Sequence, residues 1–157
     1  MSNALKTIRD AVKTVLTAQC TAAKWVDNYN GEDWDDEKYS QMRRRQAEKG
    51  NGLYVTLPRT SSSPSEPMSA DENFVQVNIV GVAGAIGDRD TAAEAAEALI
   101  WAAYVAMRKH FSGGPDELHT PWLLIGFEVL FQDGRITIAS LTMIAPCDFG
   151  YAADEEE

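Results

Sequence analysis

The fold is decided by Trp122-Leu-Leu-Ile-Gly-Phe-Glu-Val-Leu-Phe-Gln132, followed by Asp133-Gly134 and then by Arg135-Ile-Thr-Ile-Ala-Ser-Leu-Thr-Met-Ile144. Both long segments are rich in β-branched and aromatic residues, which favour strands. The Asp-Gly dipeptide between them is typical of the type I′ turn, whose twist matches that of a tight hairpin. The sequence therefore predicts two neighbouring antiparallel strands that close the fold.

The predicted turn also fixes which residues face each other. A two-residue turn pairs Phe131 with Ile136 and Val129 with Ile138, and Phe127 and Ile125 extend the same face. The opposite face is then partly hydrated, because it carries Glu128, Gln132, Arg135 and Thr137.

Two helices and two further strands are predicted before the hairpin. Apolar residues recur every three or four positions over 5–19, as in an amphipathic helix. Residues 53–57 and 74–82 alternate apolar and polar side chains, as half-buried strands do. An Ala-rich helix is predicted over 92–111, opened by a capping box of Thr91 and Glu94. A short charged helix over 37–48 is also compatible with the pattern.

The resulting order is helix, strand, strand, helix, strand, strand. We expect one α+β domain over residues 1–157, with an antiparallel four-stranded sheet packed on one face by two helices. Three segments stand apart: a polar, aromatic-containing segment 25–52, a Pro- and Ser-rich loop 58–73, and an acidic C-terminal tail 152–157. The composition of the loop predicts disorder in an isolated subunit and ordering against a neighbour.

Composition argues against several classes of protein. The apolar share of 45% is ordinary for a globular chain. No apolar run approaches the roughly 18–20 residues that span a bilayer, and the N-terminus lacks the pattern of a signal peptide. We therefore expect synthesis in a cytoplasm and no membrane partner.

No catalytic, cofactor-binding or metal-binding residues are predicted. His110 suits the end of a helix, His119 lies in a loop, and their spacing matches no metal motif. Residues 27–33 are acidic but lack the glycine placement of a calcium loop. Cys20 and Cys147 are not in a CxxC pair, so we expect small buried apolar side chains there.

Segment 25–52 supplies the candidate residues of a subunit interface, because it combines aromatic side chains with blocks of opposite charge. Two interpretations stay open: the aromatics anchor a contact between subunits, or they cover an edge of their own core and the charges are solvated. Under the first interpretation, Asp33 and the acidic residues beside it lie on one side of the contact, with the arginines at or near the other. The candidates are Trp25, Trp34, Asp35, Asp36, Tyr39, Arg43, Arg44 and Arg45.

The whole layout resembles a known family. An amphipathic helix and a polar aromatic stretch precede a short strand ending in Leu57-Pro58 and a variable loop. The strand Phe74-Val-Gln-Val-Asn-Ile-Val80 then leads into the Ala-rich helix. The hairpin of Leu123-Leu-Ile-Gly-Phe-Glu-Val129 and Ile136-Thr-Ile138 completes the order. This layout resembles the tail terminator (tail completion) proteins of tailed bacteriophages, especially the Mu-like group.

The resemblance implies a structural virion protein without catalytic residues or a cofactor. It implies a ring, usually a homohexamer, that caps the head-proximal end of the tail tube. The implied partners are further copies of the chain, the tail tube protein and neck or connector proteins, while genomic DNA only passes through the lumen. The implied location is the tail or neck of the virion, after assembly in the host cytoplasm. The alternatives are another neck, head-completion or minor tail protein, and then a small enzyme or host-directed regulator.

The net charge predicts weak binding to double-stranded DNA. At −10, the chain repels the phosphate backbone. We expect no sub-micromolar, salt-sensitive complex at physiological salt in an electrophoretic shift assay, with a basic DNA-binding protein as positive control. Tight binding that weakens with added salt would contradict both the charge argument and passage of DNA through a ring.

Overall fold

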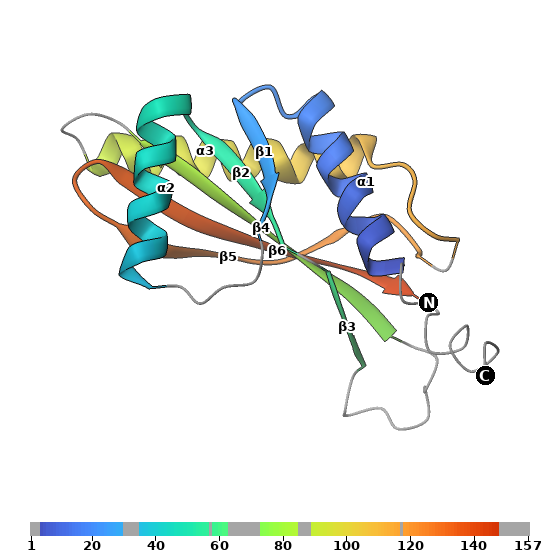
Figure 1. Cartoon of the computed structure of the whole chain (residues 1–157). Helices are drawn as coiled ribbons and strands as arrows, with labels where there is room; N and C mark the ends of the chain where they lie inside the picture. Colours follow the sequence, from blue (N-terminus) through green and yellow to red (C-terminus); the bar gives the residue numbers. More distant parts are fainter. Residues whose placement is uncertain are drawn as a thin grey trace.

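The computed structural model describes residues 4–29, 35–56, 58–62, 73–84, 89–116 and 118–147. It is an α+β fold in which three helices pack on one mixed sheet. The elements in chain order are α1 (Ala4–Gln19), β1 (Trp25–Asn28), α2 (Asp36–Lys49), β2 (Gly52–Val55), β3 (Arg59–Ser62), β4 (Asn73–Gly84), α3 (Arg89–His110), β5 (Leu123–Gln132) and β6 (Ile136–Cys147) (Figure 1).

The strands lie in the order β1-β2-β4-β6-β5, and β3 continues the position of β2 along β4. β1 runs parallel to β2, and the other pairs are antiparallel. The expected four-stranded antiparallel sheet is therefore wrong in strand number and in direction. β1 was missed because Trp25-Val-Asp-Asn28 has only two apolar residues, and an edge strand needs little more than its backbone hydrogen bonds.

Helices cover both faces of the sheet, which corrects the expectation of two helices on one face. On β4, Val77 and Ile79 point into the core under α1 and α3, whereas Val80 and Val82 point to a second cluster with Met42 of α2. Successive side chains of a strand point to opposite faces, so α2 packs on the face opposite α1 and α3. The sequence signal for α2 was weak because Met42 is its one buried residue.

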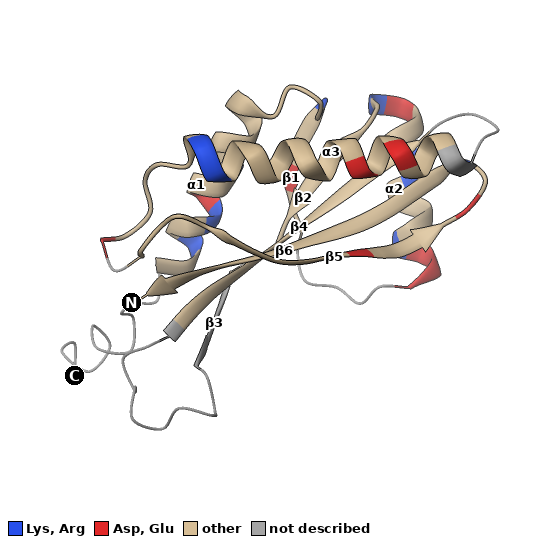
Figure 2. Ribbon diagram, turned by 180° about the vertical axis from the view of Figure 1, so that it is seen from behind, with Lys and Arg blue, Asp and Glu red and all other residues tan. Residues whose placement is uncertain are grey.

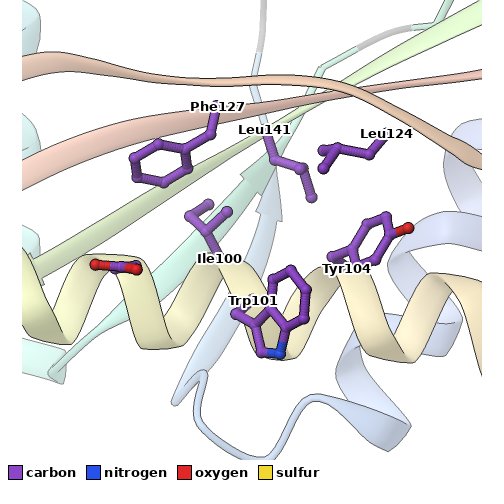
Figure 3. Close-up of a pocket in the computed structure, with 7 residues that line it drawn as sticks. Ile100, Trp101, Tyr104, Leu124, Phe127 and Leu141 are labelled. Atoms are coloured by element: carbon purple, nitrogen blue, oxygen red, sulfur yellow. The ribbon is translucent and has the colours of Figure 1, made fainter.

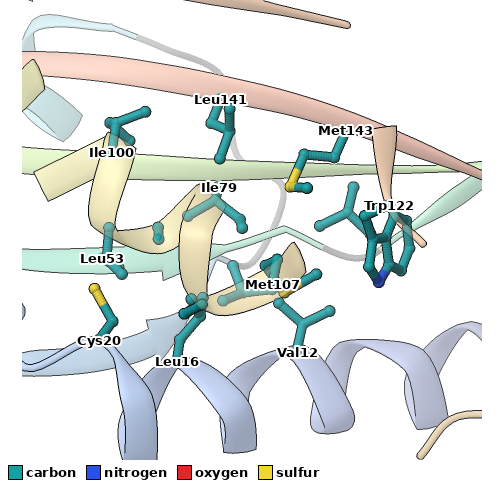
Figure 4. Packing of buried hydrophobic residues seen from close by; sticks show 14 of the residues in the cluster. Val12, Leu16, Cys20, Leu53, Ile79, Ile100, Met107, Trp122, Leu141 and Met143 are labelled. Atoms are coloured by element: carbon teal, nitrogen blue, oxygen red, sulfur yellow. The ribbon is translucent and has the colours of Figure 1, made fainter. Parts of the chain in front are cut away.

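The main core lies between the sheet and the helices α1 and α3. Val12 and Leu16 of α1 point toward Ile79 of β4 and Met107 of α3 (Figure 4). Both cysteines are buried, as expected. Amphipathic periodicity was thus a reliable guide to the elements that form this core.

The predicted helices and strands over 5–19, 37–48, 53–57, 74–82 and 92–111 are confirmed with small shifts of their ends. α3 begins at Arg89, so Thr91 lies inside the helix and is not its N-terminal cap. Part of the expected loop 58–73 is β3, which pairs with β4. The rest of that loop and the acidic tail 152–157 lie outside the described residues.

The β5–β6 hairpin forms, but its predicted register and turn type are wrong. Phe131 pairs with Ile138 and Val129 with Ala139, because the register shifts at two irregularities in β5. Gly134 lacks the positive φ of a type I′ turn. Instead, the Asp133 carboxylate accepts hydrogen bonds from the backbone N–H groups of Arg135 (2.7 Å) and Ile136 (2.9 Å). The aspartate side chain therefore organises the turn.

Two glycines give a matched test of how closely the Trp25 ring packs against β2. A Cβ added at Gly52 would lie 2.0 Å from Cε2 of Trp25, whereas one added at Gly126 meets nothing within 4 Å. We expect Gly52→Ala to lower the free energy of unfolding by about 1–3 kcal/mol through overpacking. Gly126→Ala should change it by no more than about 0.5 kcal/mol. Urea denaturation of both variants measures the difference, and equal stability would show that Trp25 is free to move aside.

Candidate interaction surface

β5 is an edge strand that exposes an unusual amount of apolar surface. Five of its large apolar side chains are between 44% and 58% exposed: Leu123, Leu124, Ile125, Phe127 and Val129. Contiguous apolar patches mark interaction sites on soluble proteins. An edge strand also presents unpaired backbone groups to which another chain can bind. We therefore take β5 as the centre of the candidate surface.

The apolar residues of β5 point to both faces of the sheet. Phe127 pairs with Leu141 and so shares the face that α3 covers. Leu123 pairs with Ile144, on the opposite face. α3 packs mainly over β4 and β6 and has few contacts with β5. Among the described residues of the chain, none therefore covers the outer side of β5.

A groove of about 260 Å³ runs between α3 and β5 (Figure 3). Leu124 and Phe127 line it from the strand, and Ile100 and Tyr104 line it from the helix. Trp101 forms part of its edge, is 60% exposed, and lies with its ring centroid 5.3 Å from that of Tyr104. Together these residues make the β5–α3 surface, which we define as Trp101, Tyr104, Leu123, Leu124, Ile125, Phe127 and Val129.

The polar groups around the groove are few. Glu97 is the one carboxylate among its lining residues. Within the described part of the chain, no three His, Cys, Asp or Glu side chains come together as a metal site. The described helices include none long and apolar enough to cross a membrane. The groove is therefore suited to bind an apolar group, with the carboxylate of Glu97 at its rim.

Trp25 and Tyr39, two of the candidate interface residues, pack within their own subunit. The Trp25 indole N–H donates a hydrogen bond to the Gly50 carbonyl (2.9 Å), and its ring meets the Tyr54 ring edge to face at 5.0 Å. Tyr39 stacks on Phe131 with centroids 4.5 Å apart. Both residues border the cluster under α2. This packing agrees with the second interpretation for Trp25 and Tyr39, and it leaves their role in a contact between subunits untested.

Two of the three arginines also have partners in the same chain. Arg43 forms an ion pair with Asp133, and Arg45 forms one with Asp27. The Arg45 guanidinium also lies 4.2 Å from the ring centroid of Trp25. These contacts connect α2 to the hairpin turn and to β1.

The remaining candidate interface residues lie at the start and in the middle of α2 or outside the described residues. The Asp35 carboxylate caps α2 by accepting from the Lys38 N–H (2.8 Å). Asp36 and Arg44 are exposed. Trp34 and Asp33 lie outside the described residues. A role in contacts between subunits stays a prediction for all eight residues of the candidate set.

The β5–α3 surface was not predicted, because its residues are of the types that usually form a core. Trp101 lies in the Ala-rich helix predicted over 92–111, where the local pattern does not mark it as exposed. One feature of the sequence could have indicated it. Leu123-Leu-Ile125 is an uninterrupted apolar run, whereas a strand with one solvent-exposed face alternates apolar and polar residues.

No protein-family model matches the chain, and no curated protein sequence matches it either.

The ion pair of Arg43 with Asp133 generates a pH prediction. Partial burial acts to raise the pKa of Asp133, but the N–H donors of Ile136 and Arg135 and the Arg43 cation outweigh it, so this pKa lies below its ordinary value of 3.8. Folding therefore favours the carboxylate, and its stabilising contribution is complete above the unfolded pKa and is lost as pH falls through the folded pKa.

Asp133→Asn should consequently be less stable than the unchanged protein at neutral pH. The two stabilities should converge as the pH falls below 3.8, the ordinary pKa of the group. Thermal melts at several pH values measure this, with Asp116→Asn in an exposed loop position as the control. A difference that persists unchanged at low pH would show that the turn does not depend on the charge of Asp133.

Proposed function

We propose that the chain is a structural subunit of a bacteriophage tail, a tail terminator that assembles into a ring. The observation that carries this proposal is the uncovered edge strand β5, with apolar side chains on both faces. Burying exposed apolar area stabilises an association by roughly 25 cal/mol per Å² before the costs of binding. An isolated subunit leaves this apolar area exposed to water, so the surface suits a protein that functions as an assembly.

The position of the surface favours a ring over a symmetric pair. It occupies one edge of the sheet, and the opposite edge, at β1 and α1, has a different chemical character with many charged and small polar side chains. A contact between two different patches is heterologous, and repeated heterologous contacts close into a ring when the rotation permits. The layout resemblance supports the same conclusion, with six subunits as the expected number.

In this role the ring binds the head-proximal end of the tail tube and offers its other end to neck or connector proteins. No reaction is needed, and the groove beside α3 offers one carboxylate rather than an acid–base pair. Another joint of the virion, such as a head-completion or minor tail protein, remains the alternative within the same structural class. A small enzyme or regulator is the alternative outside it.

Ile125→Asp tests whether β5 drives assembly. Ile125 is the most exposed of the large apolar residues of β5, at 58%, so a charge there should leave the subunit folded. We expect a defined cyclic oligomer for the unchanged chain, alone or with tail tube protein, and loss of about 2 kcal/mol or more per contact in the variant. Native mass spectrometry measures the oligomer, and circular dichroism checks the fold.

Gln41→Asp is the matched control, because it adds the same charge at an exposed position of α2. It should assemble like the unchanged chain. A protein that stays monomeric in every condition, tube protein included, would refute the ring. Assembly that ignores tube protein but responds to neck proteins would instead favour a neck role.

A further inference from the structure

One side of α3 faces the groove beside β5 and carries charge at both of its ends. Glu97, Trp101 and Tyr104 line the groove. Arg108 follows Tyr104 by four residues, so it lies on the same side of the helix. Its guanidinium donates a hydrogen bond to the Trp122 carbonyl (3.0 Å), directly before β5 begins. The groove therefore has a carboxylate toward one end and a guanidinium toward the other.

The charged side chains around the β5–α3 surface are balanced in number, so their positions matter more than their sum. Arg108 and Lys109 lie together in the last turn of α3. Figure 2 shows this blue turn near the start of β5, with the red turns of α3 toward its other end. The exposed charged side chains bordering the surface are Glu94, Glu97, Arg108, Lys109, Glu128 and Arg135.

Arg108 is available to bind an acidic group. In the described part of the chain, no carboxylate forms an ion pair with it. Its hydrogen bond to the Trp122 carbonyl uses one of the five N–H groups of a guanidinium. The remaining N–H groups can therefore donate to a carboxylate that approaches this end of the groove.

The groove itself is suited to one or two side chains rather than to a free small molecule. Its volume of about 260 Å³ is below the roughly 300–1,000 Å³ of typical small-molecule sites. Apart from Glu97, the side chains that line it are aliphatic or aromatic. An aromatic group bound there would cover Trp101, which is 60% exposed, and would form the ring contacts that aromatic pairs favour.

The chain contains a segment that matches these features. Residues 148–157 lie outside the described residues, and they read Asp-Phe-Gly-Tyr-Ala-Ala-Asp-Glu-Glu-Glu. In an extended segment Phe149, Tyr151 and Glu155 share one face, and Tyr151 is about 13 Å from Glu155. Trp101 and Arg108 are about 10.5 Å apart along the axis of α3, and the long arginine side chain covers the difference. The aromatic and acidic groups thus have a spacing similar to that of the groove and the guanidinium.

The segment is too short to fill the groove of its own subunit. The near end of the groove on β5 is at Leu124, which pairs with Met143 of β6. β6 continues to Cys147, about 13 Å beyond that point. Phe149 can return only about 7 Å from Cys147, and Tyr151 would need its whole reach of about 13 Å. The two aromatic residues therefore cannot both enter this groove, whereas the groove of a neighbouring copy carries no such restriction.

We infer that residues 148–157 of one copy dock on the β5–α3 surface of the next, with Phe149 and Tyr151 in the groove and Glu155 at Arg108. This inference rests on the proposed ring and names a contact that holds neighbouring copies together. The contact covers Trp101 and places the acidic run at the basic end of α3. It joins two different patches, so it can repeat around a closed ring.

Photo-crosslinking in the whole chain tests this contact. Tyr151 is replaced by benzoylphenylalanine, which keeps an aromatic group there, and this light chain is mixed before assembly with an equal amount of isotopically heavy chain of unchanged sequence. Irradiation should join light segment 148–157 to heavy peptides of α3 or β5, and mass spectrometry identifies the pairs. The same photoreactive residue at Gln41, an exposed position of α2, is the control and should give no such pairs.

The isotope labels distinguish the possible positions of the segment. Pairs formed only within light chains would place residues 148–157 on their own subunit and would overturn the inference. Pairs formed only with added tail tube protein would also overturn it, because the occupant would then be a different chain.

Substitutions supply a second measurement. Tyr151→Ala should weaken assembly about thirtyfold, as expected for loss of a buried aromatic anchor, whereas Tyr151→Phe should change it little. Arg108→Glu should weaken assembly about fivefold at low salt, and Glu155→Lys in the same chain should restore most of that loss. Sedimentation velocity over a range of concentrations measures assembly, and circular dichroism checks the fold, because Arg108 also binds the Trp122 carbonyl. High salt should reduce the effects of charge.

The outcomes separate the inference from the proposed function. A cyclic oligomer that forms without pairs between light and heavy chains, and that tolerates Tyr151→Ala, would overturn the inference and leave the ring intact. A chain that never assembles, tube protein included, would overturn both the inference and the ring.

Discussion

The long antiparallel ladder between β4 and β6 is the constraint on which the rest of the structure depends. It pairs every residue of β4 with one of β6, from Asn73 with Cys147 to Gly84 with Ile136. Near the hairpin end of β6 both faces of this ladder are apolar: Ala83 and Ala139 point to one side, and Val82 and Ile138 point to the other. Two layers of helix are needed there, and α3 and α2 supply them. Next along the ladder on the α2 face, Asn78 pairs with Thr142, so the apolar surface formed by Val80, Val82 and Ile138 ends there. The apolar part of the ladder therefore determines which part of this face α2 covers.

How much could be predicted from the sequence depended on the strength of each local pattern. α1 and β4 were found because their apolar periods are long and regular. β1 and α2 were hard to place because each buries little, and their positions follow from pairing and packing with distant segments. The hairpin register could not be read from the Asp-Gly signal, since the irregularities of β5 and the Asp133 side chain both alter the turn. The exposure of Trp101 depends on how far β5 extends beyond α3, and no local pattern encodes that distance.

The charged blocks of segment 25–52 show that charge alone does not distinguish a contact between chains from a contact within one chain. Arg45 lies against both Asp27 and the ring of Trp25, and Arg43 reaches the hairpin turn at Asp133. These contacts join elements far apart in sequence, so the basic run helps hold α2 on its face of the sheet. Exposed ion pairs contribute little on their own. Here the ion pairs help to position α2, because the helix has few apolar contacts with the sheet beyond those of Met42.

The irregularities of β5 have a consequence for how readily identical chains aggregate. A straight, apolar edge strand is a template on which identical chains stack into fibres. In β5 the ladder shifts between Leu124 and Gly126 and again between Val129 and Phe131. Each such bulge bends and twists the strand, so its free edge does not present an unbroken row of backbone groups. The subunit can therefore keep its apolar edge available for a side-chain contact while resisting endless strand-by-strand aggregation at the concentrations reached during synthesis.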